Sequence, residues 1–333
     1  MSSPSSVPIY TLNNGVTIPA VAHGAWAPNT DEARLKAKGW LLNALKAGYR
    51  HIDTAQDYNT EKVVGVVIKE SGIPREEIFI TSKLSSSSQH RVAESFEESL
   101  RALDVSYIDL ARHGPQKNPD GTWKIREDVN FHQAWAELEK LFEAGKIKAI
   151  GVSNFSLKTL EELAKTARIT PAVNQVECGK ISYLLDNLLT EQNLRLHPYL
   201  VQEGLREYCD KKEIVIAAYT PSGYDDVRKD PLIVGLAEKY KVTPNQITLA
   251  WHLARNIIII PKSTKEEHQK ENINVELHFP SRLSRLTNDP DQLPTLETED
   301  VLKISKLDRN QRICNAADEH GQVFGWTLER LGW

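Results

Sequence analysis

Short apolar stretches alternate with amphipathic helical stretches about eight times along this chain of 333 residues. Such alternation predicts parallel strands joined by crossover helices. The expected strands lie at residues 19–24, 49–54, 78–83, 107–112, 148–153, 172–177, 214–220 and 257–263. The last begins with four isoleucines, which is typical of a strand buried on both faces. Eight βα units predict an α/β fold whose sheet closes into a (β/α)8 TIM barrel.

A hairpin is expected ahead of the barrel, because residues 10–18 read YTLNNGVTI with a turn signal at Asn14 and Gly15. We expect this hairpin to close the bottom of the barrel. No GxGxxG run follows any expected strand, so the fingerprint of the doubly wound dinucleotide fold is missing. Length does not decide the number of domains, since α/β barrels run past about 250 residues as one unit. Residues 1–333 are therefore expected to form a single barrel domain.

The charges are interspersed and nearly balanced, with 45 acidic and 41 basic residues and a net charge of -4. No basic stripe is present, so a small molecule is a better partner than nucleic acid. Cys178, Cys209 and Cys314 form no CxxC pair, which argues against a disulfide framework and against a zinc site. The sequence has neither a signal-peptide pattern nor an apolar run of roughly 18 residues. We expect a cytoplasmic protein that needs no membrane and no metal.

In a barrel, reactive side chains gather at the C-terminal ends of the strands. Polar residues that end or follow the expected strands are Asp53, Tyr58, Lys83, His113, Ser153, Asn154 and Gln175. Taken singly, Lys83, His113 and Gln175 each fit a structural role, as a strand end or a satisfied polar group. Taken together, they indicate acid–base chemistry. An ammonium beside a phenol lowers the tyrosine pKa from about 10, and a carboxylate holds the lysine, which would make Tyr58 a tuned general acid.

Several motifs follow one another over nearly the whole chain: GYRHIDTAQDYNTEKVVG, ITSKL, GVSNF, PAVNQVE, AYTP, and IIPKST with a later EN. They resemble, in order, the motifs of the aldo-keto reductase superfamily, in particular its fungal NADP-dependent aldehyde, aldose and glycerol reductases. This resemblance implies hydride transfer from NADPH to an aldehyde, an aldose or a simple ketone, with NAD as the alternative cofactor. The C-terminal segment 321–333 resembles fungal members that act on glyceraldehyde, glycerol or aldoses, and the exact substrate stays open.

The resemblance also implies roles for individual residues. It places the catalytic tetrad at Asp53, Tyr58, Lys83 and His113, with Tyr58 as proton donor. It implies that the nicotinamide carboxamide is bound by Ser153, Asn154 and Gln175 and that the ring stacks on Tyr219. The adenosine end matches Lys262, Ser263, Glu271 and Asn272, where Lys262 would pair with the 2'-phosphate, unless this segment is merely the solvated start of a helix. Trp26 would form one wall of the substrate pocket.

Two features depart from the family pattern within these motifs. His268 stands where many relatives have an arginine on the 2'-phosphate, which leaves the choice between NADP and NAD open. The fourth strand reads YIDLARHGP where the family usually reads like YIDLYLIHWP, one residue longer. Because strand side chains alternate between faces, the deletion turns His113 to the other face unless a bulge absorbs it. Gly114 and Ser85 stand where bulky aromatic residues are common, which widens the expected pocket.

Two insertions of 18 residues, near 178–195 and 275–292, interrupt the family pattern and resemble no familiar motif. Each is either a loop on the rim of the barrel or a translated intron, and valine codons that begin GT and glutamine codons that end AG are compatible with an intron at 275–292. Nothing in the sequence specifies an oligomeric state.

A second functional interpretation stays open beside the reductase. The altered fourth strand is also compatible with a catalytically impaired relative that binds nucleotide as a regulatory subunit. A zinc dehydrogenase is disfavoured, because neither HExxH nor paired cysteines occur.

Overall fold

Parallel strands form a ring at the centre of the computed structural model, which describes residues 7–114, 131–176, 198–199, 201–275, 296–308, 322–323 and 326–327. The strands are β3 (His23–Gly24), β4 (His51–Asp53), β5 (Phe79–Ser85), β6 (Ile108–Gly114), β7 (Ile147–Ile150), β8 (Val152–Ser153), β9 (Val173–Val176), β10 (Val215–Tyr219) and β11 (Ile258–Ile260). β7 and β8 are two halves of one expected strand. Each of the eight expected strands is therefore confirmed.

The ring closes through hydrogen bonds at two seams. One sheet has the order β3-β4-β5-β6-β7 and the other β11-β10-β9-β8. At the first seam, the amide of Ala22 donates to the carbonyl of Ile259 at 2.8 Å, and the Ile259 amide donates to Ala20 at 2.8 Å. At the second seam, the chain runs from β7 into β8 through Gly151, whose amide donates to Ala111 at 3.2 Å. The predicted (β/α)8 barrel is confirmed.

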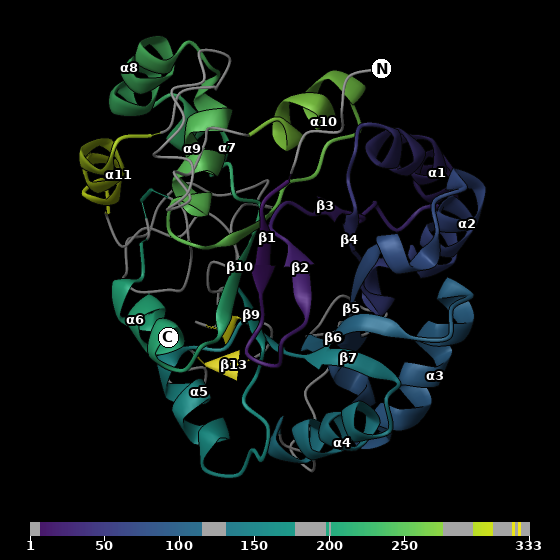
Figure 1. Ribbon diagram of the computed structural model, residues 1–333. Helices are drawn as coiled ribbons and strands as arrows, with labels where there is room; N and C mark the ends of the chain where they lie inside the picture. Colours follow the sequence, from purple (N-terminus) through teal and green to yellow (C-terminus); the bar gives the residue numbers. More distant parts are fainter. Residues whose placement is uncertain are drawn as a thin grey trace.

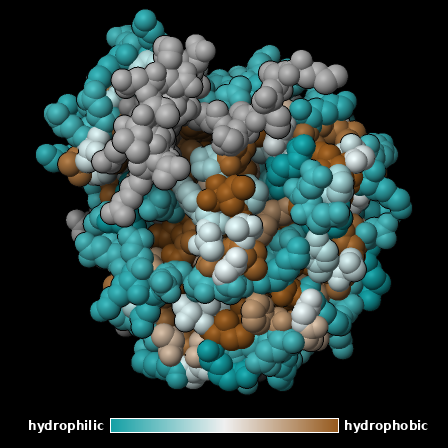
Figure 2. Space-filling view, viewed as in Figure 1, coloured by the Kyte–Doolittle hydropathy of each residue, from teal (hydrophilic) through white to brown (hydrophobic). Residues whose placement is uncertain are grey.

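The expected hairpin consists of β1 (Ile9–Thr11) and β2 (Thr17–Pro19), which pair antiparallel. Its turn has Gly15 at a φ of 83°, a left-handed conformation that glycine adopts without strain. Leu12 and Ile18 are buried against inward-facing residues from the starts of the strands, such as Val173. Figure 1 looks onto this end of the barrel, with the hairpin across its centre, and Figure 2 shows apolar residues gathered there inside a hydrophilic periphery. The hairpin therefore closes the bottom of the barrel, as expected.

Helices surround the ring (Figure 1). They are α1 (Asp31–Lys46), α2 (Glu61–Ser71), α3 (Val92–Leu103), α4 (Phe131–Glu143), α5 (Leu157–Ala164), α6 (Glu203–Lys211), α7 (Tyr224–Arg228), α8 (Pro231–Tyr240), α9 (Pro244–Leu253), α10 (Glu266–Ile273) and α11 (Thr298–Ser305). Short 3-10 turns are η1 (Gln56–Tyr58), η2 (Arg75–Glu77) and η3 (Ser86–Arg91), and β12 (Gln322–Val323) pairs with β13 (Trp326–Thr327). None of the helices in the described part combines the length and the apolar character that a membrane crossing needs.

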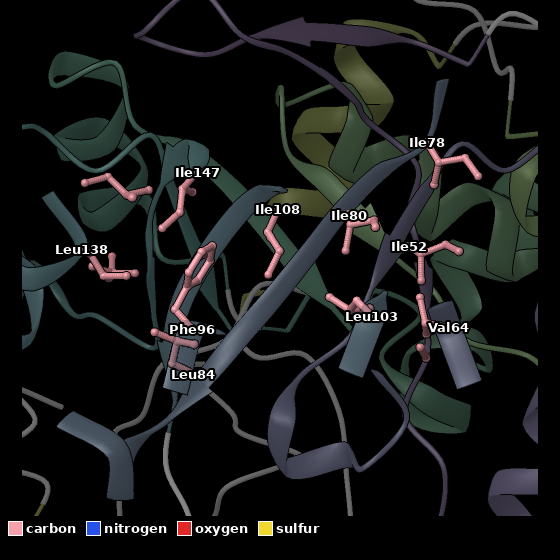
Figure 3. Packing of buried hydrophobic residues seen from close by; sticks show 14 of the residues in the cluster. Ile52, Val64, Ile78, Ile80, Leu84, Phe96, Leu103, Ile108, Leu138 and Ile147 are labelled. Carbon is pink, nitrogen blue, oxygen red and sulfur yellow. The ribbon is translucent and has the colours of Figure 1, made fainter. Parts of the chain in front are cut away.

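An apolar layer between strands and helices determines which strand residues face inward. Ile80 and Leu84 of β5 pack outward with Val64 and Phe96 of the helices (Figure 3). Because strand side chains alternate, Lys83 on the same strand faces the barrel interior. The outer layer thus fixes the register that assembles the site.

Both sequence insertions lie almost wholly outside the described residues. The first, 178–195, lies entirely outside them, and of the second, 275–292, only Val275 is described, as a buried residue. The two interpretations of these segments therefore both stay open.

Candidate functional site

A buried carboxylate at the C-terminal end of β4 holds the centre of the site. Asp53 accepts a hydrogen bond from Lys83 Nζ through Oδ1 at 2.5 Å. Lys83 Nζ also donates to the carbonyl oxygen of Thr54 at 2.9 Å. Both side chains are at least nine-tenths buried. The structure thus brings together the acid and the lysine that the sequence expects to meet.

Arg112 of β6 is the third member of this cluster. Its Nη2 donates to Asp53 Oδ2 at 2.6 Å, and its side chain is completely buried. The register explains this position, because Lys83 pairs with Arg112 in an unbroken parallel run from Thr81 to Ser85. An arginine inside an apolar strand is a visible signal in the sequence, but Arg112 was not among the expected site residues.

The same register bears on His113. No bulge interrupts the pairing of β5 with β6, so His113 is the partner of Leu84, one position away from Lys83. The side chain of His113 lies outside the described part, and its role in orienting a carbonyl stays a prediction. Arg112, and not His113, has the strand position beside Lys83.

Tyr58 ends the turn η1 directly after β4 and is partly buried. Lys83 Nζ lies 4.8 Å from the centre of its ring. Burial, and then the charge of Asp53, raise the pKa of Tyr58 well above its ordinary value, while the charge of Arg112 acts in the opposite direction. The expectation of a lowered pKa for Tyr58 is therefore wrong, because burial and the charge of Asp53 outweigh the positive charge of Arg112. The phenol stays protonated at neutral pH.

The pKa values of the cluster follow from burial and from the pairing of charges. Burial alone would raise the pKa of Asp53, but the charges of Lys83 and Arg112 and hydrogen bonds from Lys83 and Gln175 hold it below its ordinary value. Burial lowers the pKa of Lys83 to about 8, with the Asp53 charge opposing and the Arg112 charge adding to the effect. The cluster therefore contains a carboxylate, a permanent cation and a lysine whose pKa is lowered to about 8.

The residues expected at the nicotinamide lie beside this cluster on β8, β9 and β10. Gln175 Nε2 donates to Asp53 Oδ2 at 2.8 Å, while its Oε1 has no hydrogen-bond partner among the described residues. Ser153 Oγ donates to the backbone carbonyl of Gln175 at 3.1 Å. Tyr219 donates from its hydroxyl to Asn154 Oδ1 at 3.1 Å. The four residues therefore lie side by side, and Gln175 connects them to Asp53.

The residues expected at the adenosine end follow β11. The exposed Lys262 has its ammonium 5.4 Å from the ring centre of Trp40 and 5.9 Å from that of Trp26. Ser263 accepts through Oγ from the Lys265 amide at 3.1 Å, and His268 is exposed.

Two further residues expected at the adenosine end belong to a network between α9 and α10. Glu271 Oε1 accepts from Thr243 Oγ1 at 2.6 Å, and Asn272 Oδ1 accepts from Asn245 Nδ2 at 2.7 Å. Thr243 and Asn245 were not predictable from the sequence, since their role depends on a contact between helices.

No metal site competes with this assignment in the described ranges, which contain no group of three or more His, Cys, Asp or Glu side chains placed to hold an ion. A cavity of about 590 Å³ lies at the other end of the barrel, between the hairpin, α6 and the start of β10. None of the expected site residues lines this cavity.

Known proteins share this arrangement of motifs and fold. Residues 20–282 match the aldo/keto reductase family. The chain is 36% identical over 290 residues to glycerol 2-dehydrogenase (NADP(+)) of Saccharomyces cerevisiae, covering 80% of this chain and 86% of that protein. It is 36% identical over 312 residues to glyoxal reductase of Bacillus subtilis, covering 92% and 95%.

Among solved structures, the aldo-keto reductase of Bombyx mori in complex with NADP superposes with a TM-score of 0.76. It is 28% identical in sequence, with 96% of this chain and 98% of that chain covered. The chain belongs to the aldo/keto reductase family, a family of oxidoreductases, as its motifs indicated.

Proposed function

We propose that the protein reduces aldehydes, simple ketones or aldoses to alcohols with NADPH, and oxidises polyols in the reverse direction. The observation that carries this proposal is the buried Asp53–Lys83 pair, 2.5 Å long, next to the phenol of Tyr58 at the C-terminal end of the barrel. A protonated phenol beside a held ammonium is a suitable donor for the oxygen of a carbonyl that gains a hydride.

The residues present fit a nicotinamide nucleotide. Gln175 Oε1 is a buried acceptor without a partner in the described part, which suits a carboxamide N–H. Lys262 is an exposed cation with no carboxylate partner among the described residues, which suits a phosphate. When bound, the cofactor supplies the hydride.

Each protein group then has a part in the reaction. Tyr58 donates its phenolic proton to the carbonyl oxygen as the carbonyl carbon gains the hydride. The phenolate then regains a proton from solvent. Lys83 stabilises the phenolate that forms, and Asp53 holds Lys83 in place. Ser153, Asn154 and Gln175 would hold the carboxamide, and the ring would stack on Tyr219. Trp26, which is 43% exposed, offers an apolar wall for the substrate.

The names of two relatives support NADP as the cofactor. The yeast glycerol 2-dehydrogenase is designated an NADP(+) enzyme, and the Bombyx mori structure contains NADP. Lys262 would contact the 2'-phosphate alone or with His268, since histidine lacks the fork of donors that arginine presents. We place the enzyme in the cytoplasm, where a reducing environment suits a free, buried thiol such as Cys209.

One observation favours a second function, a catalytically impaired subunit that only binds the nucleotide. His113 is the register partner of Leu84, and Arg112 takes the strand position beside Lys83.

A single experiment separates the two functions. NADPH oxidation is measured with glyceraldehyde, an aldose and an aromatic aldehyde, using the wild type, Tyr58→Phe and the control Tyr10→Phe. Tyr10 is a second partly buried phenol, bonded to the Leu253 carbonyl at the opposite end of the barrel. We expect Tyr58→Phe to lose about 10²–10⁴-fold in kcat and Tyr10→Phe to keep it. Full turnover in Tyr58→Phe contradicts the mechanism, whereas NADPH binding without turnover in the wild type supports the impaired subunit.

A further inference from the structure

The Asp53 carboxylate is shared between two cations. Its Oδ1 is bonded to Lys83 at 2.5 Å and its Oδ2 to Arg112 at 2.6 Å. A second aspartate or glutamate does not contact Arg112 among the described residues. With both bases protonated, the three side chains carry a net charge of +1 inside the barrel, where an uncompensated charge is costly.

Arg112 is fixed in this place by the backbone around it. The pairing of β6 with β5 is continuous on both sides of Arg112. Gly151, on the next strand, leaves room for the arginine stem, since a Cβ there would lie 3.3 Å from Arg112 Cγ. The guanidinium is thus part of the barrel interior and not a flexible surface group.

The groups that face Arg112 come from four elements and include the proposed proton donor and the lysine beside it. They are Asp53 on β4, Tyr58 on η1, Lys83 on β5 and Tyr219 on β10. His51, one layer below, also senses Arg112, but burial lowers its pKa to about 4, so it is neutral at the pH of interest. Asp57 adds a more distant negative charge on the Tyr58 side.

Because arginine keeps its proton, the net positive charge of the cluster can fall only when a neighbouring group loses a proton. Loss of a proton from Tyr58 or from Lys83 relieves it, and Arg112 lowers the pKa of both groups. For Tyr58 this effect opposes burial and Asp53, which act in the other direction.

We propose that Arg112 is a positioning residue of the reaction proposed above: it holds the Asp53 carboxylate and supplies a permanent positive charge that favours proton donation by Tyr58, independently of His113. This inference rests on the proposed function. It assigns to Arg112 an electrostatic role in the reaction, in addition to its structural role as the partner of Asp53.

The test compares pH profiles of kcat for NADPH-dependent glyceraldehyde reduction in the wild type, Arg112→Gln and Arg112→Lys. Glutamine keeps a donor for Asp53 without the charge, and lysine keeps the charge. Arg75→Gln is the matched control, because Arg75 makes a comparable ion pair to Asp109 at 2.7 Å, at the other end of β6. NADPH affinity, from fluorescence quenching, shows that each variant is folded and loaded.

We expect Arg112→Gln to bind NADPH as the wild type does and to lose at least about tenfold in kcat. The alkaline limb of its pH profile of kcat should shift to higher pH by about 1–3 units, because removing a nearby positive charge raises the pKa of both Tyr58 and Lys83. Arg112→Lys should keep the wild-type limb, and Arg75→Gln should change neither kcat nor the limb.

An Arg112→Gln profile lowered equally at every pH, or not lowered at all, overturns the proposal and leaves the proposed function standing. If Arg112→Gln does not fold, Arg112→Lys decides, since an alkaline limb displaced in that variant contradicts a role for the charge. A wild type that binds NADPH but reduces no carbonyl overturns both proposals.

Discussion

Gln56 accepts a hydrogen bond from the backbone amide of Ser85 through Oε1, at 3.1 Å. This bond joins the turn that carries Tyr58 to the strand that carries Lys83. The same oxygen accepts from Ser95 Oγ at 2.7 Å, and Gln56 Nε2 donates to the Ser95 carbonyl at 2.7 Å. One amide side chain therefore ties the turn that carries the phenol to the strand that carries the ammonium, beside the bonds of Lys83 to Asp53 and Thr54, and no motif in the sequence indicates it.

Replacing Gln56 tests this connection. We expect Gln56→Ala to lower kcat about tenfold or more with little change in NADPH affinity, because a small displacement of a catalytic group is costly. The free energy of unfolding should fall by about 1–3 kcal/mol, since donors that Gln56 satisfied lose their partner. Steady-state kinetics and urea unfolding measure the two effects. The control is Asn13→Ala, which removes an amide bonded to the Pro171 carbonyl at the bottom of the barrel and should leave kcat unchanged.

Lys262 is expected to distinguish NADPH from NADH. Lys262→Ala should weaken NADPH binding by about 1.5–3 kcal/mol, the usual range for a hydrogen bond to a charged group, and leave NADH binding unchanged because NADH lacks the 2'-phosphate. Fluorescence titration with both cofactors gives the comparison. Lys69→Ala removes an equal charge from an exposed lysine on α2 and should affect neither cofactor. Equal losses for NADPH and NADH in Lys262→Ala would place the 2'-phosphate elsewhere.

Much of the barrel and part of the site follow from the sequence. The eight strands were predictable because short apolar stretches are separated by longer stretches with helical periodicity. The meeting of Asp53 with Lys83 was predictable because both end parallel strands. The position of Arg112 was not, since a one-residue deletion either flips the strand or forms a bulge, and only the pairing of β5 with β6 decides between them.

The pKa of Tyr58 shows a second limit of sequence reasoning. The sequence indicates which charges lie near the phenol but not how deeply the phenol is buried. Burial is the largest cause of the shift, and it acts opposite to the expected direction. The depth of a side chain depends on what packs above it, which is a property of the assembled barrel.

The buried ammonium of Lys83 should make stability depend on pH. Burial lowers its pKa from 10.5 to about 8 in the folded protein. Between these values the unfolded chain holds a proton that the folded protein has released, so the free energy of unfolding rises with pH across this window. The gain is absent below pH 8 and complete above pH 10.5, and it amounts to about 3–4 kcal/mol at about 1.4 kcal/mol per pKa unit.

The comparison of wild type with Lys83→Met isolates this dependence. Urea unfolding at the two ends of the window should give a difference between the proteins that changes by up to about 3–4 kcal/mol, because methionine fills similar space without a proton to lose. Lys69→Met, at an exposed position, should show the same pH dependence of the free energy of unfolding as the wild type. A constant difference between wild type and Lys83→Met would mean that Lys83 keeps its proton through the whole window.

Gly151 lies at the junction of β7 and β8, where two neighbouring groups leave no room for a side chain. A Cβ at this position would lie 2.6 Å from the backbone oxygen of Val173 and 3.3 Å from Arg112 Cγ. The first contact is with a strand backbone that cannot move without disturbing the barrel, so Gly151→Ala should destabilise the protein by about 1–3 kcal/mol. Urea unfolding measures this loss. Gly39→Ala is the matched control, because Gly39 lies in α1, where an added Cβ would meet no atom within 4 Å apart from its chain neighbours and the backbone of its own helix. There alanine should stabilise by about 0.5–1 kcal/mol through its higher helix propensity. If Gly151→Ala is as stable as the wild type, the strands at this junction are not packed as tightly as the contact to Val173 requires.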